Sequence, residues 1–330
     1  LFRLIGHDNP DSLENRLPGV ALIPGAGEFV YATDPVFDDL GEGASSAENV
    51  HGVTGEADLL ASLDDLAAAA PNLGTVSLVV GWFGDNLDAA AITIRPGVEN
   101  AAKRTYPQSW SVAGIARDGA HIVSQKDGRP AYGGTPSDAT VIAAIQAVKA
   151  KGWRVTFYPF VFMDVAADNA LTDPYTGAVG QPAYPWRGRV TCSPAPGLAG
   201  SPDQGAGAGA AVSNFFGGAW GLRRMVLHYA QLCADAGGVD AFLIGSELRG
   251  ITRLRADADT YPGVTALMTL AADVRAILGG GTKIGYGADW SEYNNHQTGD
   301  AAGALRFNLD PLWADANIDF IGIDNYMPLA

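Results

Sequence analysis

The sequence has few cysteines, few positive charges and no long apolar run. Its 330 residues include two cysteines, Cys192 and Cys233, with no Cys-x-x-Cys pair and no Cys/His cluster around them. Zinc sites are built from such clusters, so this spacing argues against one. We therefore expect two free thiols, with a single disulfide as the alternative.

The shortage of positive charge excludes other partners. Lys and Arg total 21 against 36 Asp and Glu, which gives a formal net charge of −15. A surface of this sign repels phosphate backbones, so nucleic-acid binding is not expected. No apolar run approaches the roughly 20 residues of a membrane-spanning helix. The chain opens at Leu1 without a leader-like segment, and we expect a processed product or a fragment of a longer protein.

What the sequence does contain is enough apolar material for a large core. Hydrophobic residues make up 47% of the chain and charged residues 17%, which is typical of a globular domain. The 42 Gly and 19 Pro show no collagen-like period, so they indicate many loops.

Apolar residues alternate between strand and helix periods along the chain. Short β-branched or apolar runs predict strands at 20–23, 75–82, 153–161, 239–245, 283–288 and 319–324, and an extended piece at 28–31. Helical spacing predicts helices at 56–70, 138–151, 219–236, 263–278 and, more weakly, 311–314. The Gly/Ala-rich segment 197–211 is expected to be coil.

Strands that alternate with helices pair in parallel, which leaves a doubly wound sheet or a (β/α)8 TIM barrel. No Gly-x-Gly-x-x-Gly follows the first strand, which disfavours a dinucleotide-binding fold. The long segments 83–136 and 163–214 both follow strands, as the loops of a barrel's active face do. We predict one TIM-barrel domain over 1–330, with about six barrel strands and with these two segments as rim insertions.

Acidic and aromatic residues follow the predicted strands. In a barrel they would gather on one rim, as in sugar sites, where aromatic faces stack on sugars and carboxylates perform acid/base chemistry. Helix capping or bonding to loop amides is the alternative role for each acid. The residues concerned are Asp85, Asp164, Glu247, Asp289, Glu292 and Asp324, with Trp82, Trp290 and Tyr326 beside them.

Glu247 is the sharpest candidate for a catalytic acid. The apolar run 242–246 delivers its carboxylate to the rim. Partial desolvation there would raise its pKa and suit it to protonate a leaving oxygen. The alternative is an ion pair with Arg249 or Arg253. Glycoside hydrolysis needs a second carboxylate, about 5 Å away for retention or about 6.5–9.5 Å for inversion, and Asp289, Glu292 and Asp324 are the candidates. Asp85, Asp164, Trp82, Trp290 and Tyr326 are predicted to bind substrate.

No metal ion or cofactor is predicted. The five histidines are scattered, and His228 is expected to be structural because it lies beside the apolar stripe of its helix. No HExxH, GxSxG or P-loop motif occurs. The acidic residues Asp164, Asp168 and Asp173 lack the spacing of a calcium loop.

Five blocks in order resemble the glycoside-hydrolase-like TIM-barrel module of the large tail-tip hub ("megatron", host-specificity) protein of gene transfer agents and related phage-like particles. They are Arg3–Asn9, Arg16–Pro24, Gly128–Pro136, Phe242–Gly250 and Phe320–Leu329.

This resemblance implies a barrel within a longer polypeptide at the distal end of a phage-type tail, in the virion baseplate. The implied partners are other tail and baseplate proteins and cell-surface glycan, with oligomerisation through the hub. By analogy with barrel glycosidases, Glu247 stands at the end of strand four, although Ser246 replaces their usual Asn. The expected activity is binding, with or without hydrolysis, of peptidoglycan or surface polysaccharide. The alternatives are an inactive structural or receptor-binding module and, third, a free-standing metabolic enzyme.

Overall fold

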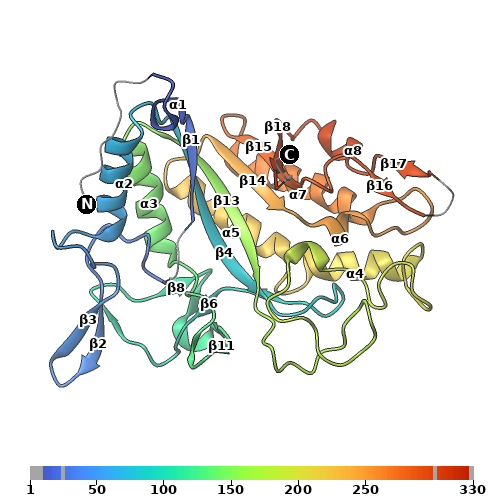
Figure 1. Ribbon diagram of the computed structural model, residues 1–330, viewed down its shortest axis with the longest axis horizontal. Helices are drawn as coiled ribbons and strands as arrows, with labels where there is room; N and C mark the ends of the chain where they lie inside the picture. The colour runs from blue at the N-terminus through green and yellow to red at the C-terminus, as the bar shows by residue number, and fades with distance from the viewer. Residues whose placement is uncertain (1–9, 24–26, 300–302, 327–330) are drawn as a thin grey trace.

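Six parallel strands form the main sheet, and each pairs with the next one along the chain (Figure 1). The computed structural model describes residues 10–23, 27–299 and 303–326; the block Arg3–Asn9 lies outside them. The six strands are β1 (Gly19–Leu22), β4 (Thr75–Gly84), β13 (Arg154–Met163), β14 (Ala241–Ser246), β15 (Lys283–Asp289) and β18 (Phe320–Asp324). This order and the curl of the sheet make the fold TIM-barrel-like: a partial barrel of six strands, as the sequence predicts.

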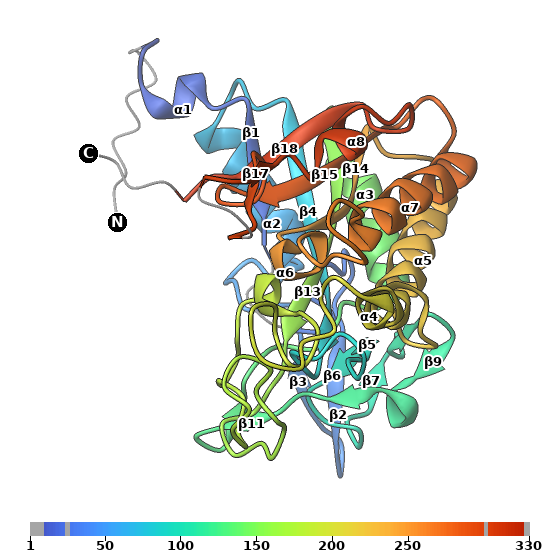
Figure 2. The same ribbon diagram turned by 90° about the vertical axis from the view of Figure 1, so that its right-hand side faces the viewer.

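Helices cover the convex side of the sheet, and α3, α5 and α7 lie together on that side in Figure 2. Trp82, Phe157 and Phe242 are fully buried on this side. Trp82 and Phe157 pack against Tyr229 of α5, and Phe242 stacks on Phe157. The helices are α1 (Leu13–Arg16), α2 (Asp58–Ala69), α3 (Asp138–Ala150), α4 (Ala206–Gly217), α5 (Leu222–Asp235), α6 (Arg249–Thr252), α7 (Pro262–Leu278) and α8 (Asp310–Trp313).

Strand β13 shows how the sequence sets the two faces of the sheet. Its buried residues alternate with half-buried ones along all ten positions. Because strand side chains alternate between faces, Val155, Phe157 and Val161 face the helices, whereas Tyr158 and Phe160 face the concave side. The concave side therefore carries an aromatic stripe at the place where a substrate site would form.

The predicted strands and helices of the barrel are confirmed to within a few residues, but two local predictions are wrong. The expected extended piece at 28–31 is a turn, closed by the Val30 N–H on the Gly27 carbonyl and the Ala32 N–H on the Phe29 carbonyl. The expected coil at 197–211 gives way to α4 from Ala206 onward. Alanine is the strongest helix former, and Ala208, Ala211, Val212 and Phe215 make one buried stripe.

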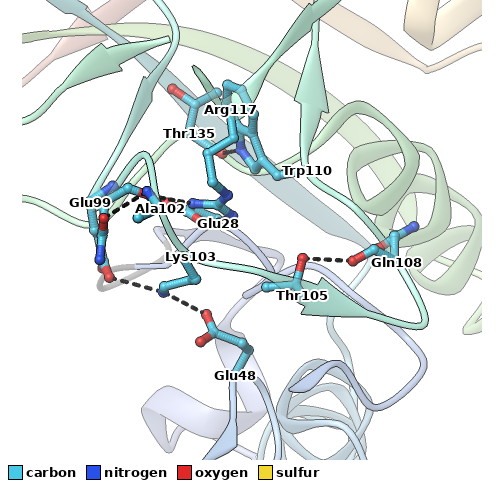
Figure 3. Close-up of polar contacts among 11 residues, drawn as sticks. Glu28, Glu48, Glu99, Ala102, Lys103, Thr105, Gln108, Trp110, Arg117 and Thr135 are labelled. Carbon is cyan, nitrogen blue, oxygen red and sulfur yellow. Dashed lines mark hydrogen bonds and ion pairs between the residues drawn. The ribbon is translucent and has the colours of Figure 1, made fainter. Parts of the chain in front are cut away.

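The segment between β4 and α3 holds only short strands. Figure 3 shows how it is tied to the rest of the protein. The fully buried Glu28 forms an ion pair with Arg117 and accepts the Glu99 N–H at 2.9 Å. Lys103 adds ion pairs to Glu48 at 3.0 Å and to Glu99 at 3.3 Å. These contacts hold the segment between β4 and α3 against the turn at 28–31 and against Glu48.

Strand β5 (Ile94–Arg95) adds a short antiparallel partner to β4 at the main sheet. The remaining short strands pair with one another outside this sheet. The others are β2 (Phe37–Gly41), β3 (Ala44–Ala47), β6 (Gly97–Val98), β7 (Thr105–Tyr106), β8 (Ser111–Val112), β9 (Ile115–Ala116), β10 (His121–Ile122), β11 (Gln125–Lys126), β12 (Arg129–Pro130), β16 (His296–Gln297) and β17 (Leu305–Arg306), with 3-10 turns at Arg117–Gly119 and Arg187–Arg189.

Both cysteines are buried free thiols, which confirms the expectation. No helix within the described ranges has the length and apolar character needed to cross a bilayer. The His228 imidazole donates to Asp138 Oδ1 at 2.8 Å, as a structural contact between α5 and α3.

Candidate functional site

A cavity of about 600 Å³ lies on the concave side, at the carboxyl ends of the strands. This is where the loops of a TIM barrel build active sites. We call it the main cavity. Its lining residues are Ala21, Ile23, Val79, Tyr158, Phe160, Phe162, Trp186, Arg187, Glu247, Arg249, Asp289, Trp290, Ser291, Asp324 and Tyr326.

The end of β14 is irregular, and this irregularity aims Glu247 at the cavity. The register with β15 shifts between Leu243 and Ser246, and Glu247 adopts a positive φ of 51°. A non-glycine residue in this region costs roughly 1–2 kcal/mol. Two bonds hold it there: the Glu247 N–H to the Gly287 carbonyl at 2.7 Å, and the Leu248 N–H to the Tyr286 hydroxyl at 2.8 Å. Such strained positions cluster at functional sites.

The Glu247 carboxylate is 95% buried and has two donors from the segment after β13. The Trp186 indole N–H donates to Oε2, and the Arg187 guanidinium lies 3.1 Å from the same oxygen. Arg187 is itself fixed, because it donates to the Ser246 carbonyl at 2.9 Å and hydroxyl at 2.7 Å and stacks 3.8 Å above the Phe160 ring. The predicted ion pair is therefore present, but with Arg187 in place of Arg249 or Arg253.

The pKa of Glu247 is raised above its ordinary value. Burial is the largest cause, and the charge of Asp324 and a hydrogen bond to its side chain add to it. Arg187 and Trp186 oppose the shift, but they do not reverse it. Two carboxyl groups in hydrogen-bonding contact cannot both ionise freely. The arrangement thus favours the protonated form of Glu247 more than an exposed glutamate would.

Gly287 lies next to this pair on the intervening strand. Glu247 and Asp324 come from β14 and β18, and β15 lies between them. A Cβ on Gly287 would stand 3.2 Å from the Ser246 Cβ and 3.6 Å from Asp324 Oδ2. The Tyr158 hydroxyl reaches the same space and donates to Asp324 Oδ2 at 3.0 Å. Burial raises the pKa of Tyr158, so it remains a donor at neutral pH.

Asp289 supplies a third carboxylate to the cavity. It stands in register with Asp324 on the neighbouring strand, and its Oδ1 accepts the Ser291 N–H at 2.8 Å and the Ser291 hydroxyl. Trp290 and Tyr326 are 40% and 74% exposed beside it. Five residues predicted from the sequence therefore meet at the main cavity: Glu247, Asp289, Asp324, Trp290 and Tyr326.

Glu292 lies behind the cavity, not on its lining. It is fully buried and accepts hydrogen bonds from the Thr252 hydroxyl at 2.7 Å, the Tyr286 hydroxyl at 2.9 Å and the Asp289 N–H at 3.1 Å. Burial raises its pKa to about 7 against these three bonds. Since Tyr286 in turn holds the backbone after Glu247, Glu292 is placed to position the catalytic candidate instead of touching a substrate.

Trp82, Asp85 and Asp164 do not line the main cavity. Trp82 is fully buried on the helix side, where its indole N–H donates to the Tyr229 hydroxyl at 2.8 Å. Asp85 accepts the Thr93 N–H at 2.7 Å and the Thr93 hydroxyl at 2.6 Å. Asp164 contacts His121 at 2.7 Å and accepts the Ser124 N–H at 2.9 Å. Trp82 therefore joins β4 to α5, and the two Asp side chains hold loop segments together.

Sequence reasoning missed Tyr158, Phe160, Phe162, Trp186 and Arg187. The first three are visible as aromatics at period two in β13, a signal that was available. Trp186 and Arg187 belong to a segment with no periodicity, so only the fold brings them to Glu247. Within the described ranges, no group of three or more His, Cys, Asp or Glu side chains could hold a metal ion.

Comparisons with known proteins bear mainly on the fold. A sequence family described as a GTA TIM-barrel-like domain matches residues 220–330. No curated protein matches the chain. A GH113 β-mannanase from Alicyclobacillus acidocaldarius, solved in complex with ManMIm, is 15% identical with a TM-score of 0.48, over 94% of this chain and 62% of that one. A GH113 β-1,4-mannanase complex is 15% identical with a TM-score of 0.41, over 82% and 56%. The chain thus spans less than two thirds of both structures.

Proposed function

We propose that the main cavity binds cell-envelope glycan, peptidoglycan or surface polysaccharide, and hydrolyses it with Glu247 as the general acid. The observation that carries this proposal is the buried Glu247 beside the half-buried Asp324 at the carboxyl end of a TIM-barrel-like sheet. A carboxyl group whose pKa is raised above its ordinary value suits protonation of a glycosidic oxygen.

The other residues of the cavity fit this chemistry. Trp290, Tyr326 and the aromatic side chains of β13 offer flat apolar faces for sugar rings. Asp324 is in hydrogen-bonding contact with Glu247, closer than the 5 Å or more that separates an acid from a nucleophile or base. We therefore assign to Asp324 the role of raising the pKa of Glu247. Asp289 is our candidate for the second catalytic carboxylate.

We further propose that the chain works at the tail tip of a phage-like particle, as part of a hub protein that contacts baseplate proteins and the bacterial envelope. The match of residues 220–330 to the GTA TIM-barrel-like family supports this setting, together with the sequence blocks that resemble the hub. If particles without the module assemble but fail to adsorb to cells, a receptor role is supported; if they fail to assemble, the role is that of a scaffold.

A binding module without turnover is the second candidate. It is favoured by the contacts of Glu247 Oε2, which accepts the Trp186 N–H and pairs with Arg187. These contacts stabilise the ionised form and so oppose general-acid catalysis. The two candidates differ in turnover but share the cavity.

The test is release of reducing ends from purified sacculi and from surface polysaccharide. We expect Glu247→Gln to reduce turnover by at least about 100-fold while glycan binding persists, because the amide keeps the shape but has no acidic proton. Asp65→Asn is the matched control, since Asp65 is an exposed carboxylate on α2, and it should leave turnover unchanged. Hydrolysis that survives Glu247→Gln removes the catalytic assignment. Binding without hydrolysis by the unaltered chain supports the second candidate.

A further inference from the structure

The main cavity continues into two neighbouring cavities around Arg249. A cavity of about 580 Å³ shares Arg249, Trp290 and Ser291 with it, and one of about 410 Å³ shares Trp186 and Arg249. Arg253 lines both of these neighbours. We call the three together the Arg249 groove. Its length beyond the Glu247 site gives room for further sugars of a chain.

The two neighbouring cavities concentrate positive charge, because Arg189, Arg249 and Arg253 line them and no Asp or Glu side chain is among the described residues of their lining. Arg249 is half-buried and has no ion pair within the described ranges. Arg189 stacks on the Tyr175 ring at 4.6 Å and likewise pairs with no described carboxylate. Arg253 donates to the backbone carbonyls of Ser291 at 2.7 Å and Asn295 at 3.0 Å instead of to an acid. Such a cluster of arginine side chains is unusual on a chain whose net charge is −15.

The guanidinium group of Arg253 has unfilled hydrogen-bonding capacity and lies close to the like charge of Arg249. Its Nε is buried without a hydrogen-bond partner. Burial lowers its pKa to about 10, and the charge of Arg249 is the next cause; Glu292 and Asp289 oppose the shift. Two like charges that repel each other in a half-buried wall are stabilised when an anion joins them. A bound anion would supply the missing partner.

We propose that the Arg249 groove recognises a sugar that carries a carboxylate, either a hexuronic acid or an amino sugar with a lactyl ether. This inference rests on the proposed glycan-binding function and names the substrate class. Guanidinium groups bind carboxylates through paired N–H donors. The aromatic faces of Trp290, Tyr293 and Trp186 stand in the same walls to hold the sugar ring. A sugar carboxylate would be repelled by the carboxyl groups of Glu247 and Asp324. It would therefore lie on the Arg249 side of the groove.

The experiment compares acidic glycans with their neutral counterparts by titration calorimetry on the 330-residue chain. The probes are trigalacturonate and its carboxyl-reduced form, and peptide-stripped peptidoglycan oligosaccharides and their carboxyl-reduced form. We expect at least one acidic probe to bind about tenfold or more tightly than its reduced form, as charge-assisted bonds of this kind provide. The advantage should shrink in 0.5 M NaCl. The two acidic probes distinguish the two carboxylate sources.

Substitutions at Arg249 test whether this residue causes the preference for the acidic probe. Arg249→Gln should weaken binding of the acidic probe far more than binding of the reduced form, so that the preference is lost, whereas Arg249→Lys should keep part of the preference. Arg154→Gln is the matched control, because Arg154 is exposed at the opposite, amino end of β13, and it should change neither. Equal binding of acidic and reduced probes, or a preference that survives Arg249→Gln, overturns the inference while the glycan-binding proposal stands. If neither acidic nor neutral glycans bind, both fail.

Discussion

Glu292 makes a quantitative prediction about stability and pH. Its pKa in the folded protein is about 7 against an ordinary value of 4.5. The native state therefore holds this proton more tightly than the unfolded chain does. By linkage, stability from this group is fully present below pH 4.5 and is lost as the pH rises to about 7. The shift of about 2.5 pKa units corresponds to roughly 3 kcal/mol, of which about 2–3 kcal/mol falls between pH 5 and pH 8.

Replacement by glutamine isolates that contribution. Glu292→Gln keeps an acceptor for Thr252 and Tyr286 but cannot titrate. Its amide nitrogen faces the Asp289 N–H, so we expect it to be less stable than the parent at pH 5 by about 1–3 kcal/mol for one lost buried bond. The parent then loses stability with rising pH relative to the variant.

The assay is urea unfolding followed by tryptophan fluorescence at several pH values from 5 to 8, above the isoelectric point near 4.6. The difference in unfolding free energy, parent minus variant, should fall by about 2–3 kcal/mol over this range. Other carboxylates cancel in the difference. A difference that stays constant or rises with pH would refute the assigned pKa and its cause.

Three further predictions concern the pair at the site, the insertion and the catalytic candidate. Arg187→Gln should raise the pKa of Glu247 further, because the lost charge opposed the effect of burial; carboxyl NMR, with Glu247→Gln to identify the resonance, measures it, and a fall in that pKa contradicts the ion-pair geometry. Arg117→Met should destabilise the protein by about 3–5 kcal/mol, since it leaves Glu28 charged and buried; adding Glu28→Gln should restore part of the loss in urea unfolding, and strict additivity would argue against the pair. Asp324→Asn should lower the pKa of Glu247 by removing a neighbouring negative charge, and carboxyl NMR that finds no downward shift contradicts the effect of Asp324 on Glu247.

Much of the barrel could be predicted from the sequence because its elements are long and periodic. Strand β4 is a ten-residue strand whose only polar side chains are Thr75 and Ser77, and α5 has a clear stripe of Leu222, Met225, Val226 and Tyr229. Helix α4 was missed because Gly and Ala dominate its first turns, and a stripe of small residues resembles low-complexity coil until Phe215 completes it.

The candidate site was only half predictable for a different reason. The acids after β14, β15 and β18 could be placed because strand ends converge on one rim. Trp82 was misplaced by side-chain parity: Val79 and Gly81 face the concave side, so residue 82 faces the helices. Trp186 and Arg187 reach Glu247 across 60 residues of sequence, and no local pattern encodes such a contact.

The contact between Glu247 and Asp324 also has a mechanical meaning. The two residues stand on β14 and β18, which are not neighbours, because β15 lies between them. A flatter sheet would therefore draw the carboxyl groups apart and remove the part of the Glu247 pKa shift that Asp324 causes, while the part caused by burial would remain. The pKa of Glu247 thus depends on the curvature of the sheet as well as on the burial of the side chain.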